Sequence, residues 1–207
     1  MLSTRAGDNV GIVAYVNAVG GQDELVFDGN SMVISEEGIL VSKATSFDET
    51  LLTVTLHPEN VFNKRIHDPR RRKEKVMIPG VRHIEYISLT SPKQISKDGF
   101  RNNGNTEFLN PHQEVYKALT TGLRDYVTKN KFKKVLIGIS GGIDSALVAA
   151  LAVDALGKSN VIGVSMVSQY TSEDSKADAR KLAKNLGFEL LEIPIDSLFR
   201  QFLAELK

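Results

Sequence analysis

The sequence predicts an α/β protein: a parallel sheet with flanking helices, preceded by a segment rich in β-strands. The second half alternates short apolar runs, typical of buried strands, with longer stretches of helical periodicity. The first 56 residues contain short runs of β-branched and aromatic residues separated by turn residues. Charge is divided similarly, because residues 1–56 carry two basic and eight acidic residues, whereas residues 57–110 carry eleven basic and six acidic ones. We therefore predict three parts, at 1–56, 57–109 and 110–207.

The composition excludes several classes of protein. With 42% hydrophobic and 25% charged residues among 207, the chain has the proportions of a globular protein and not of a disordered one. It contains no cysteine, which excludes a disulfide framework, a thiolate zinc site and a cysteine nucleophile. No apolar stretch approaches the roughly 20 residues of a membrane span, and residues 1–9 lack the pattern of a signal peptide. We expect a cytoplasmic protein that binds no membrane.

The first part is predicted to be a meander of short strands without helices. Its apolar runs are bounded by Gly20-Gly21, by Asp28-Gly29 and by residues 36–38, which are typical turn residues. A sheet must bury its apolar face against another layer, and this segment offers none, so we expect part of the domain to lie outside the chain. The predicted strands are Val10–Val16, Glu24–Ser35, Gly38–Ser42 and Leu51–Leu56.

The middle part, residues 57–109, is predicted to be a linker with some order around Ile84 and Ile87. Its periodicity is weak, and it contains four prolines. The basic run at residues 70–73 is compatible with nucleic-acid binding, but no aromatic residue is interleaved with it. A solvated loop is the preferred interpretation, so we expect no nucleic-acid partner.

The third part begins with a helix signal and continues as alternating strands and helices. Asn110 before Pro111, with Gln113 three residues after the Asn, predicts an N-capped helix to about Lys129. A later helix is apolar on nearly every side, so we expect it to be buried, and Thr171 with Asp174 predicts a capping box for the next one. The alternation predicts a parallel sheet. The strands are 134–139, 161–167 and 188–195, and the helices are 146–156, 171–187 and from 197 onward.

A glycine-rich segment, Ser140-Gly141-Gly142-Ile143-Asp144-Ser145, stands between the first of these strands and its helix. An open α/β sheet binds its ligand at such a place. Consecutive glycines let backbone N–H groups converge and the helix dipole favours an anion, so phosphate or pyrophosphate is the expected ligand. The serine hydroxyls can donate to phosphate oxygens without adding charge. With the end of the strand, the candidate residues are Gly138, Ile139, Ser140, Gly141, Gly142, Ile143, Asp144 and Ser145.

Asp144 indicates a metal ion. A carboxylate repels a bare phosphate, so its presence predicts a divalent cation between the two, with Mg²⁺ as the expected ion. The alternative is structural: the glycines make a tight turn, and Asp144 or Ser145 caps the helix. Two other phosphate motifs are excluded. Gly157-Lys158-Ser159 lacks the glycine that a Walker A loop needs at position 152, and the loop contains no G-x-G-x-x-G.

The sequence resembles glutamine-dependent NAD synthetases, a family of ATP pyrophosphatases. The loop Ser-Gly-Gly-x-Asp-Ser after an apolar strand is similar to the pyrophosphate loop of that superfamily. Residues 15–17 and 19–29 look like the final sheet of the nitrilase-type glutaminase domain that precedes the synthetase domain in this family. The flanks that look like the synthetase domain are Glu114–Tyr116, Leu123–Tyr126, Gly138–Gly157 and Tyr170–Ser172 with Ser175 and Asp178-Ala179. In all, the resemblance covers about residues 9–56 and 110–207.

The resemblance implies an adenine nucleotide α-hydrolase-like fold and a reaction. Enzymes of this family convert ATP, deamido-NAD and ammonia into NAD, AMP and pyrophosphate through an adenylate. The loop would bind ATP and Asp144 would hold Mg²⁺. The end of the second strand, at Ser165, Met166 and Val167, is a weaker candidate for adenine contacts, and residues 168–172 are a further one. We expect a homo-oligomer.

Two departures from the family pattern qualify these expectations. The family hydrolyses glutamine with a cysteine, a glutamate and a lysine located before the strands seen here, and this chain has no cysteine, so we expect no glutaminase activity. Most deamido-NAD contacts are expected beyond residue 207, so the sequence looks like the middle of a longer protein. Two alternatives stay open: another amidating or thiolating ATP pyrophosphatase, and a noncatalytic nucleotide-binding fragment.

Overall fold

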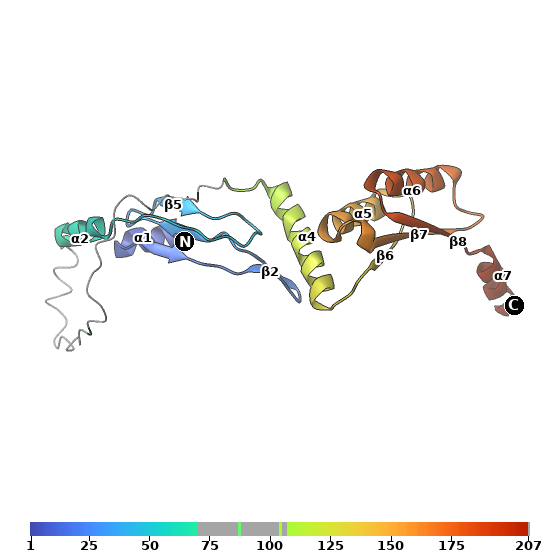
Figure 1. The fold of residues 1–207 in the computed structure, drawn as a ribbon, viewed down its shortest axis with the longest axis horizontal. Coiled ribbons are helices and arrows are strands. Elements are labelled where there is room, and N and C mark those ends of the chain that lie inside the picture. Colours follow the sequence, from blue (N-terminus) through green and yellow to red (C-terminus); the bar gives the residue numbers. More distant parts are fainter. Residues whose placement is uncertain (70–86, 88–103, 105–106, 207) are drawn as a thin grey trace. The chain divides into compact units, whose positions relative to one another are not determined.

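The chain forms two compact units (Figure 1). The computed structural model describes residues 1–69, 87, 104 and 107–206, so the basic run at 70–73 and the alternation around Ile84 lie outside the described residues. One unit comprises residues 1–18 and 29–108, and the other comprises residues 19–28 and 109–207. The predicted α/β class is confirmed, because the second unit contains a parallel sheet with helices. The division into domains at 56/57 and 109/110 stays a prediction, as does the nitrilase-type origin of the first part.

The parallel sheet has three strands in the order β6-β7-β8. These are β6 (Val135–Gly138), β7 (Val161–Val167) and β8 (Glu189–Pro194), close to the predicted bounds. Gly138 pairs with Val164, and Val164 with Leu191, so the carboxyl ends of the strands lie near one another. The helices of the unit are α4 (Pro111–Lys129), α5 (Ile143–Leu156), α6 (Glu173–Leu186) and α7 (Asp196–Glu205), with a short 3₁₀ turn at Lys158–Asn160.

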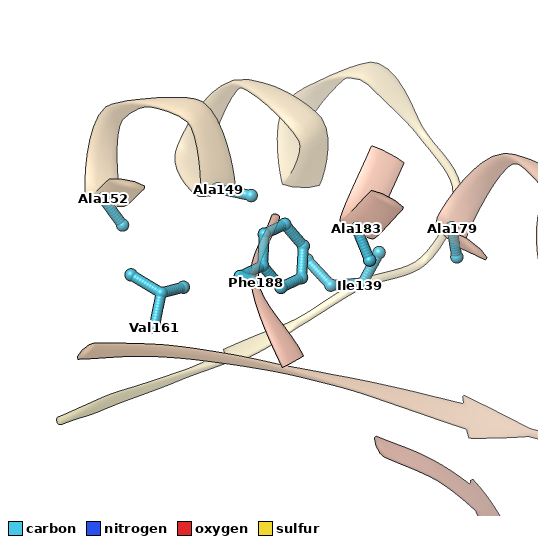
Figure 2. Close-up of a cluster of buried hydrophobic side chains, with 7 residues drawn as sticks. All are labelled: Ile139, Ala149, Ala152, Val161, Ala179, Ala183 and Phe188. Carbon is cyan, nitrogen blue, oxygen red and sulfur yellow. The ribbon is translucent and has the colours of Figure 1, made fainter. Parts of the chain in front are cut away.

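Small side chains bring α5 and α6 close to this sheet. Figure 2 shows the alanines of both helices turned toward Val161 of β7 and Phe188. Ile139, which directly follows β6, is 3% exposed and belongs to the same cluster. The core therefore continues to the residue that precedes the glycine-rich loop. Its buried members are Ile139, Ala149, Ala152, Val161, Ala179, Ala183 and Phe188.

One predicted helix cap is confirmed and the other is wrong. Gln113 N–H donates to Asn110 Oδ1 at 2.9 Å, which confirms the N-cap expected for α4. Asn110 N–H also donates to Gln113 Oε1 at 3.3 Å, so the cap is a full capping box. The N-cap of α6 is Ser172 instead of Thr171, because Ser172 Oγ accepts from Ser175 N–H at 3.1 Å. The Thr171 hydroxyl is used in the preceding turn, where it accepts from Ser168 N–H at 3.0 Å.

Helix α5 is longer and less buried than predicted. It begins at Ile143, three residues before the expected start, and Gly157 ends it as predicted. Leu147 and Val148 are 54% and 49% exposed, since α5 turns only its alanine side toward the core and leaves its other side open. Within the described ranges, neither this apolar helix nor any other has the length and hydropathy to cross a membrane.

The first unit contains an antiparallel sheet in the order β1-β4-β5, with two helices that the sequence did not predict. Helix α1 (Leu2–Asn9) is short and buries only Ala6. Helix α2 (Pro58–His67) begins with a first-turn proline in the segment taken as a linker. The strand expected at Leu51–Leu56 is absent there, and Leu51 is 82% exposed. The strands are β1 (Val13–Tyr15), β4 (Met32–Ile34) and β5 (Leu40–Lys43).

A two-stranded hairpin, β2 (Val19–Gln22) and β3 (Leu25–Asp28), belongs to the second unit. Gly20 and Gly21 were expected to form a turn, but both lie inside β2. The chain reverses instead at Asp23, whose φ is +52°. Both glycines lie against α4, where a side chain would have little room.

One face of the parallel sheet is apolar and open, and we expect the chain to self-associate through it. Side chains alternate along a strand, so Leu136, Met166 and Leu191 share the face opposite the core. They are 70%, 58% and 40% exposed. Parallel sheets normally bury both faces, so this face favours pairing with another copy.

Size-exclusion chromatography with light scattering at several concentrations would measure this self-association. Leu136→Lys with Leu191→Lys should lower the oligomeric state, whereas Leu119→Lys on α4, at a leucine 51% exposed, is the matched control. A parent chain that stays monomeric at every concentration would contradict the prediction.

Candidate nucleotide-binding loop

The glycine-rich loop joins the end of β6 to the start of α5. Ile139 N–H still donates to Val164 O at 2.8 Å, so the strand pairing extends one residue beyond Gly138. Residues 140–142 then form the turn, and Ile143 is the first residue of the helix. The structure thus places the eight predicted loop residues, 138–145, on a strand end, a turn and a first helical turn.

The two serines of the loop hold its shape through a small hydrogen-bond network. Ser145 Oγ donates to Gly142 O at 3.0 Å and lies 3.1 Å from Ser140 Oγ. Gly142 N–H donates to Ser140 Oγ at 3.2 Å, and Ser140 N–H donates to Ser145 Oγ at 3.3 Å. Both hydroxyls therefore lie at the start of α5, where hydroxyl donors can face an anion.

Gly141 lets the loop pack directly against the first turn of α6. Its φ is +84°, and a Cβ atom at this position would lie 2.5 Å from Ser175 O and 2.8 Å from Ser175 Cα. A side chain has no room here, so the N-termini of α5 and α6 come together at the loop. The positive ends of two helix dipoles then favour an anionic ligand at this edge of the sheet.

Asp144 does not cap α5. The N-cap is Gly142, which has no side chain to cap the helix, and Asp144 is the second helical residue. The capping interpretation is therefore wrong for Asp144, whereas the Ser145 hydroxyl does bind the N-cap residue by donating to Gly142 O. The Asp144 side chain is exposed, and no described residue donates a hydrogen bond to its carboxylate.

A magnesium ion fits this donor set only when phosphate oxygens complete it. Among the described residues no group of three histidine, aspartate or glutamate side chains could hold a metal ion. Mg²⁺ commonly binds one or two carboxylates and takes its other ligands from water and substrate phosphates. A single free carboxylate beside a phosphate-binding turn matches that pattern.

The weaker candidates on β7 do not converge on one point. Ser165 and Val167 lie on the core side of the sheet, and Ser165 is buried. Met166 lies on the opposite, open face, because adjacent residues of a strand alternate. Val167 O accepts from Ile195 N–H at 2.9 Å, and Gln169 N–H donates to Asp196 Oδ1 at 2.9 Å, so the segment after β7 is held by α7.

A surface depression of about 360 Å³ flanks the loop between α5 and α6. Sequence reasoning did not identify its α6 side, where Lys181 brings a positive charge next to Gly141 and Gly142. The α6 residues that line the depression are spaced as on one face of a helix, which the sequence shows. Their position next to the loop depends on the packing of α6 on α5, which the sequence does not show. The lining residues are Gly141, Gly142, Ile143, Ala146, Asp178, Lys181, Leu182 and Asn185.

Comparison with known proteins agrees with the sequence resemblance. Residues 115–207 match the family model described as NAD synthase. The glutamine-dependent NAD(+) synthetase of Aquifex aeolicus is 48% identical over 204 residues, which are 99% of this chain and 35% of the relative. That of Thermotoga maritima is 46% identical over 211 residues, which are 100% of this chain and 35% of the relative.

A solved structure of similar fold carries a nucleotide. The glutamine-dependent NAD+ synthetase of Acinetobacter baumannii in complex with adenosine diphosphate matches with a TM-score of 0.76 and 30% identity. The match covers 99% of this chain and 32% of that one. The chain thus spans about a third of the length of these relatives.

Proposed function

We propose that the chain, whose residues 115–207 match the NAD synthase family model, supplies the nucleotide-binding part of an NAD synthetase. In the proposed reaction ATP activates deamido-NAD as an adenylate and releases pyrophosphate. Ammonia then displaces AMP and leaves NAD. The observation that carries the proposal is the loop at 140–145, where two serine hydroxyls lie 3.1 Å apart at the start of α5.

The loop would hold the phosphates that leave. As the bond between the α and β phosphates of ATP breaks, negative charge grows on the departing pyrophosphate. Backbone N–H groups at the start of α5 would stabilise that charge from fixed positions. The hydroxyls of Ser140 and Ser145 would add to this by turning from their hydrogen bonds within the loop to the phosphate. Lys181, beside the loop, adds a positive charge to the same surface.

Asp144 would hold magnesium at the phosphates. A bound magnesium ion would withdraw negative charge from the phosphate oxygens. The Asp144 carboxylate is exposed in the first turn of α5, so the fold need not rearrange for it to bind a cation. The ADP bound to the Acinetobacter baumannii relative supports an adenine nucleotide as the ligand of this fold.

The experiment follows nucleotide binding and product formation. The purified chain should bind ATP with Mg²⁺ in calorimetry. With deamido-NAD and ammonium added, any NAD and pyrophosphate should form in equal amounts, because one reaction releases both. Ammonium is the nitrogen source because the sequence has no cysteine for glutamine hydrolysis, and glutamine in its place should yield no ammonia.

The same assay distinguishes the two alternatives. AMP formed with another acceptor, but not with deamido-NAD, would favour a different amidating or thiolating enzyme. Binding of Mg–ATP without any AMP formation would favour a noncatalytic nucleotide-binding module. A chain that binds no nucleotide would contradict all three functions.

A further inference from the structure

The hairpin of residues 19–28, which we call the arm, packs against α4 (Figure 1). Gly21 N–H donates to Asp125 Oδ2 at 2.8 Å, and Lys129 Nζ donates to Gly21 O at 2.5 Å. Asp125 and Lys129 are four residues apart, so they share a face of the helix. Strand β2 pairs with β3 along one edge only. On its other edge these two side chains supply the hydrogen-bond acceptor and donor that a neighbouring strand would otherwise offer to Gly21.

The contact between the arm and α4 leaves little room for a side chain on either element. A Cβ atom on Gly21 would lie 3.0 Å from Gly122 Cα, and one on Gly122 would lie 3.1 Å from Val26 Cγ2. At Gly20 an added Cβ atom would lie 2.6 Å from Asp125 Oδ2. The backbones of Gly21 and Gly122 lie directly against each other, so the arm packs on α4 in one defined position, which we call its seat.

Helix α4 connects the arm to the helix that bears the loop. The Tyr116 hydroxyl donates to the Asp154 carboxylate of α5, and this hydrogen bond raises the pKa of Tyr116. Leu123 packs against the buried cluster that contains Ala149 of α5. Asp154 is near the C-terminal end of α5, and the N-terminal end of this helix follows the glycine-rich loop. A movement of α4 would therefore be passed to the loop through α5.

The arm is also tied covalently to the first unit at both ends. The chain leaves that unit at Ala18 and returns to it at Gly29. The neighbouring strands β1 and β4 pair with each other, with Tyr15 opposite Met32. A change in the first unit therefore has a direct route to the seat on α4.

We propose that the arm couples the first unit to the nucleotide loop, with Asp125 and Lys129 as positioning residues. A seated arm fixes α4 against α5 and keeps the loop in its binding form, and release of the arm lowers the affinity for Mg–ATP. Linkage requires the reverse effect to be equal, so Mg–ATP favours the seated arm by the same factor. The identity of the ligand rests on the proposed function, whereas the effect of the arm on the loop does not.

The first experiment releases and then locks the arm in the full chain. Asp125→Ala with Lys129→Met removes both contacts and keeps good helix formers in α4, so Mg–ATP affinity should fall about fivefold or more. Val26→Cys with Gly122→Cys, added to this variant, gives a chain with no other thiol. Oxidation should restore the affinity, and reduction should remove it again.

Two single variants serve as controls. Asp125→Asn keeps an acceptor oxygen for Gly21 N–H, so its affinity should stay near that of the parent. Glu114→Ala removes a carboxylate from the first turn of α4, away from the arm, and should change nothing.

Hydrogen exchange without nucleotide separates this proposal from the proposed function. In the released variant, exchange should become faster at the amides of Gly21, Gly142 and Ala146. Faster exchange at Gly21 alone, with unchanged Mg–ATP affinity, would overturn the coupling. If the parent binds no Mg–ATP but exchange at Gly142 and Ala146 still follows the arm, the proposed function fails and the coupling stands.

Discussion

Replacing Gly141 with alanine should abolish Mg–ATP binding, while replacing the adjacent Gly142 should leave most of it. At Gly141 the φ of +84° strains any other residue, and a methyl group would meet the Ser175 backbone at 2.5 Å. The backbone strain alone costs about 1–3 kcal/mol, and the contact cannot be relieved by a side-chain rotation. The loop must therefore move away from α6 and lose the alignment of its donors.

Gly142 is the matched control because it is the next residue of the loop and has a backbone conformation open to any residue. Its φ is −87°, and the nearest atom to an added methyl group is Ser140 Oγ at 3.4 Å. Calorimetric titration with Mg–ATP and thermal melts of both variants test the prediction. Equal affinities for Gly141→Ala and the parent would show that the loop does not bind the nucleotide through this turn.

The parts of the fold that depend on local signals could be predicted from the sequence. Strand β7 was predicted at its observed bounds, because a continuous apolar run ends there in polar residues. The N-cap at Asn110 was predicted because the atoms of a cap all belong to one helical turn. The loop was placed correctly between strand and helix for the same reason.

The errors arise where contacts between distant residues decide the structure. Gly20 and Gly21 have the chemistry of a turn, and only their approach to α4 explains why they lie within a strand. Gly141 is glycine partly because Ser175 of another helix lies against it. Neither contact leaves a periodic trace in the sequence, so local reasoning could not find it.

The division of α5 into a buried and an open side also depends on tertiary packing. Its sequence is apolar all round, which predicts burial on every side. Ala149 and Ala152 face the core, while the larger Leu147 remains half exposed. Which side is covered is set by the position of the sheet, and the helix itself carries no polar stripe that would indicate it.

Replacing Asp144 with asparagine should weaken Mg–ATP binding by about thirtyfold. A unit negative charge and a divalent cation about 4 Å apart attract each other by roughly 2 kcal/mol even at the dielectric constant of water. The fold should be unaffected, because Asp144 is exposed and makes no cap. Asp174→Asn is the matched control, since Asp174 is likewise exposed and is the second residue of α6, so both variants lose the same interaction with a helix dipole.

The sign of the effect should depend on the metal. In EDTA the Asp144 carboxylate only repels the ATP phosphates, so Asp144→Asn should then bind ATP as tightly as the parent or more tightly. Calorimetry with and without Mg²⁺ measures both affinities, and circular dichroism checks the fold. A loss of affinity that is equal in Mg²⁺ and in EDTA would contradict a metal role, because a residue that acts only on the shape of the loop would weaken binding in both conditions alike.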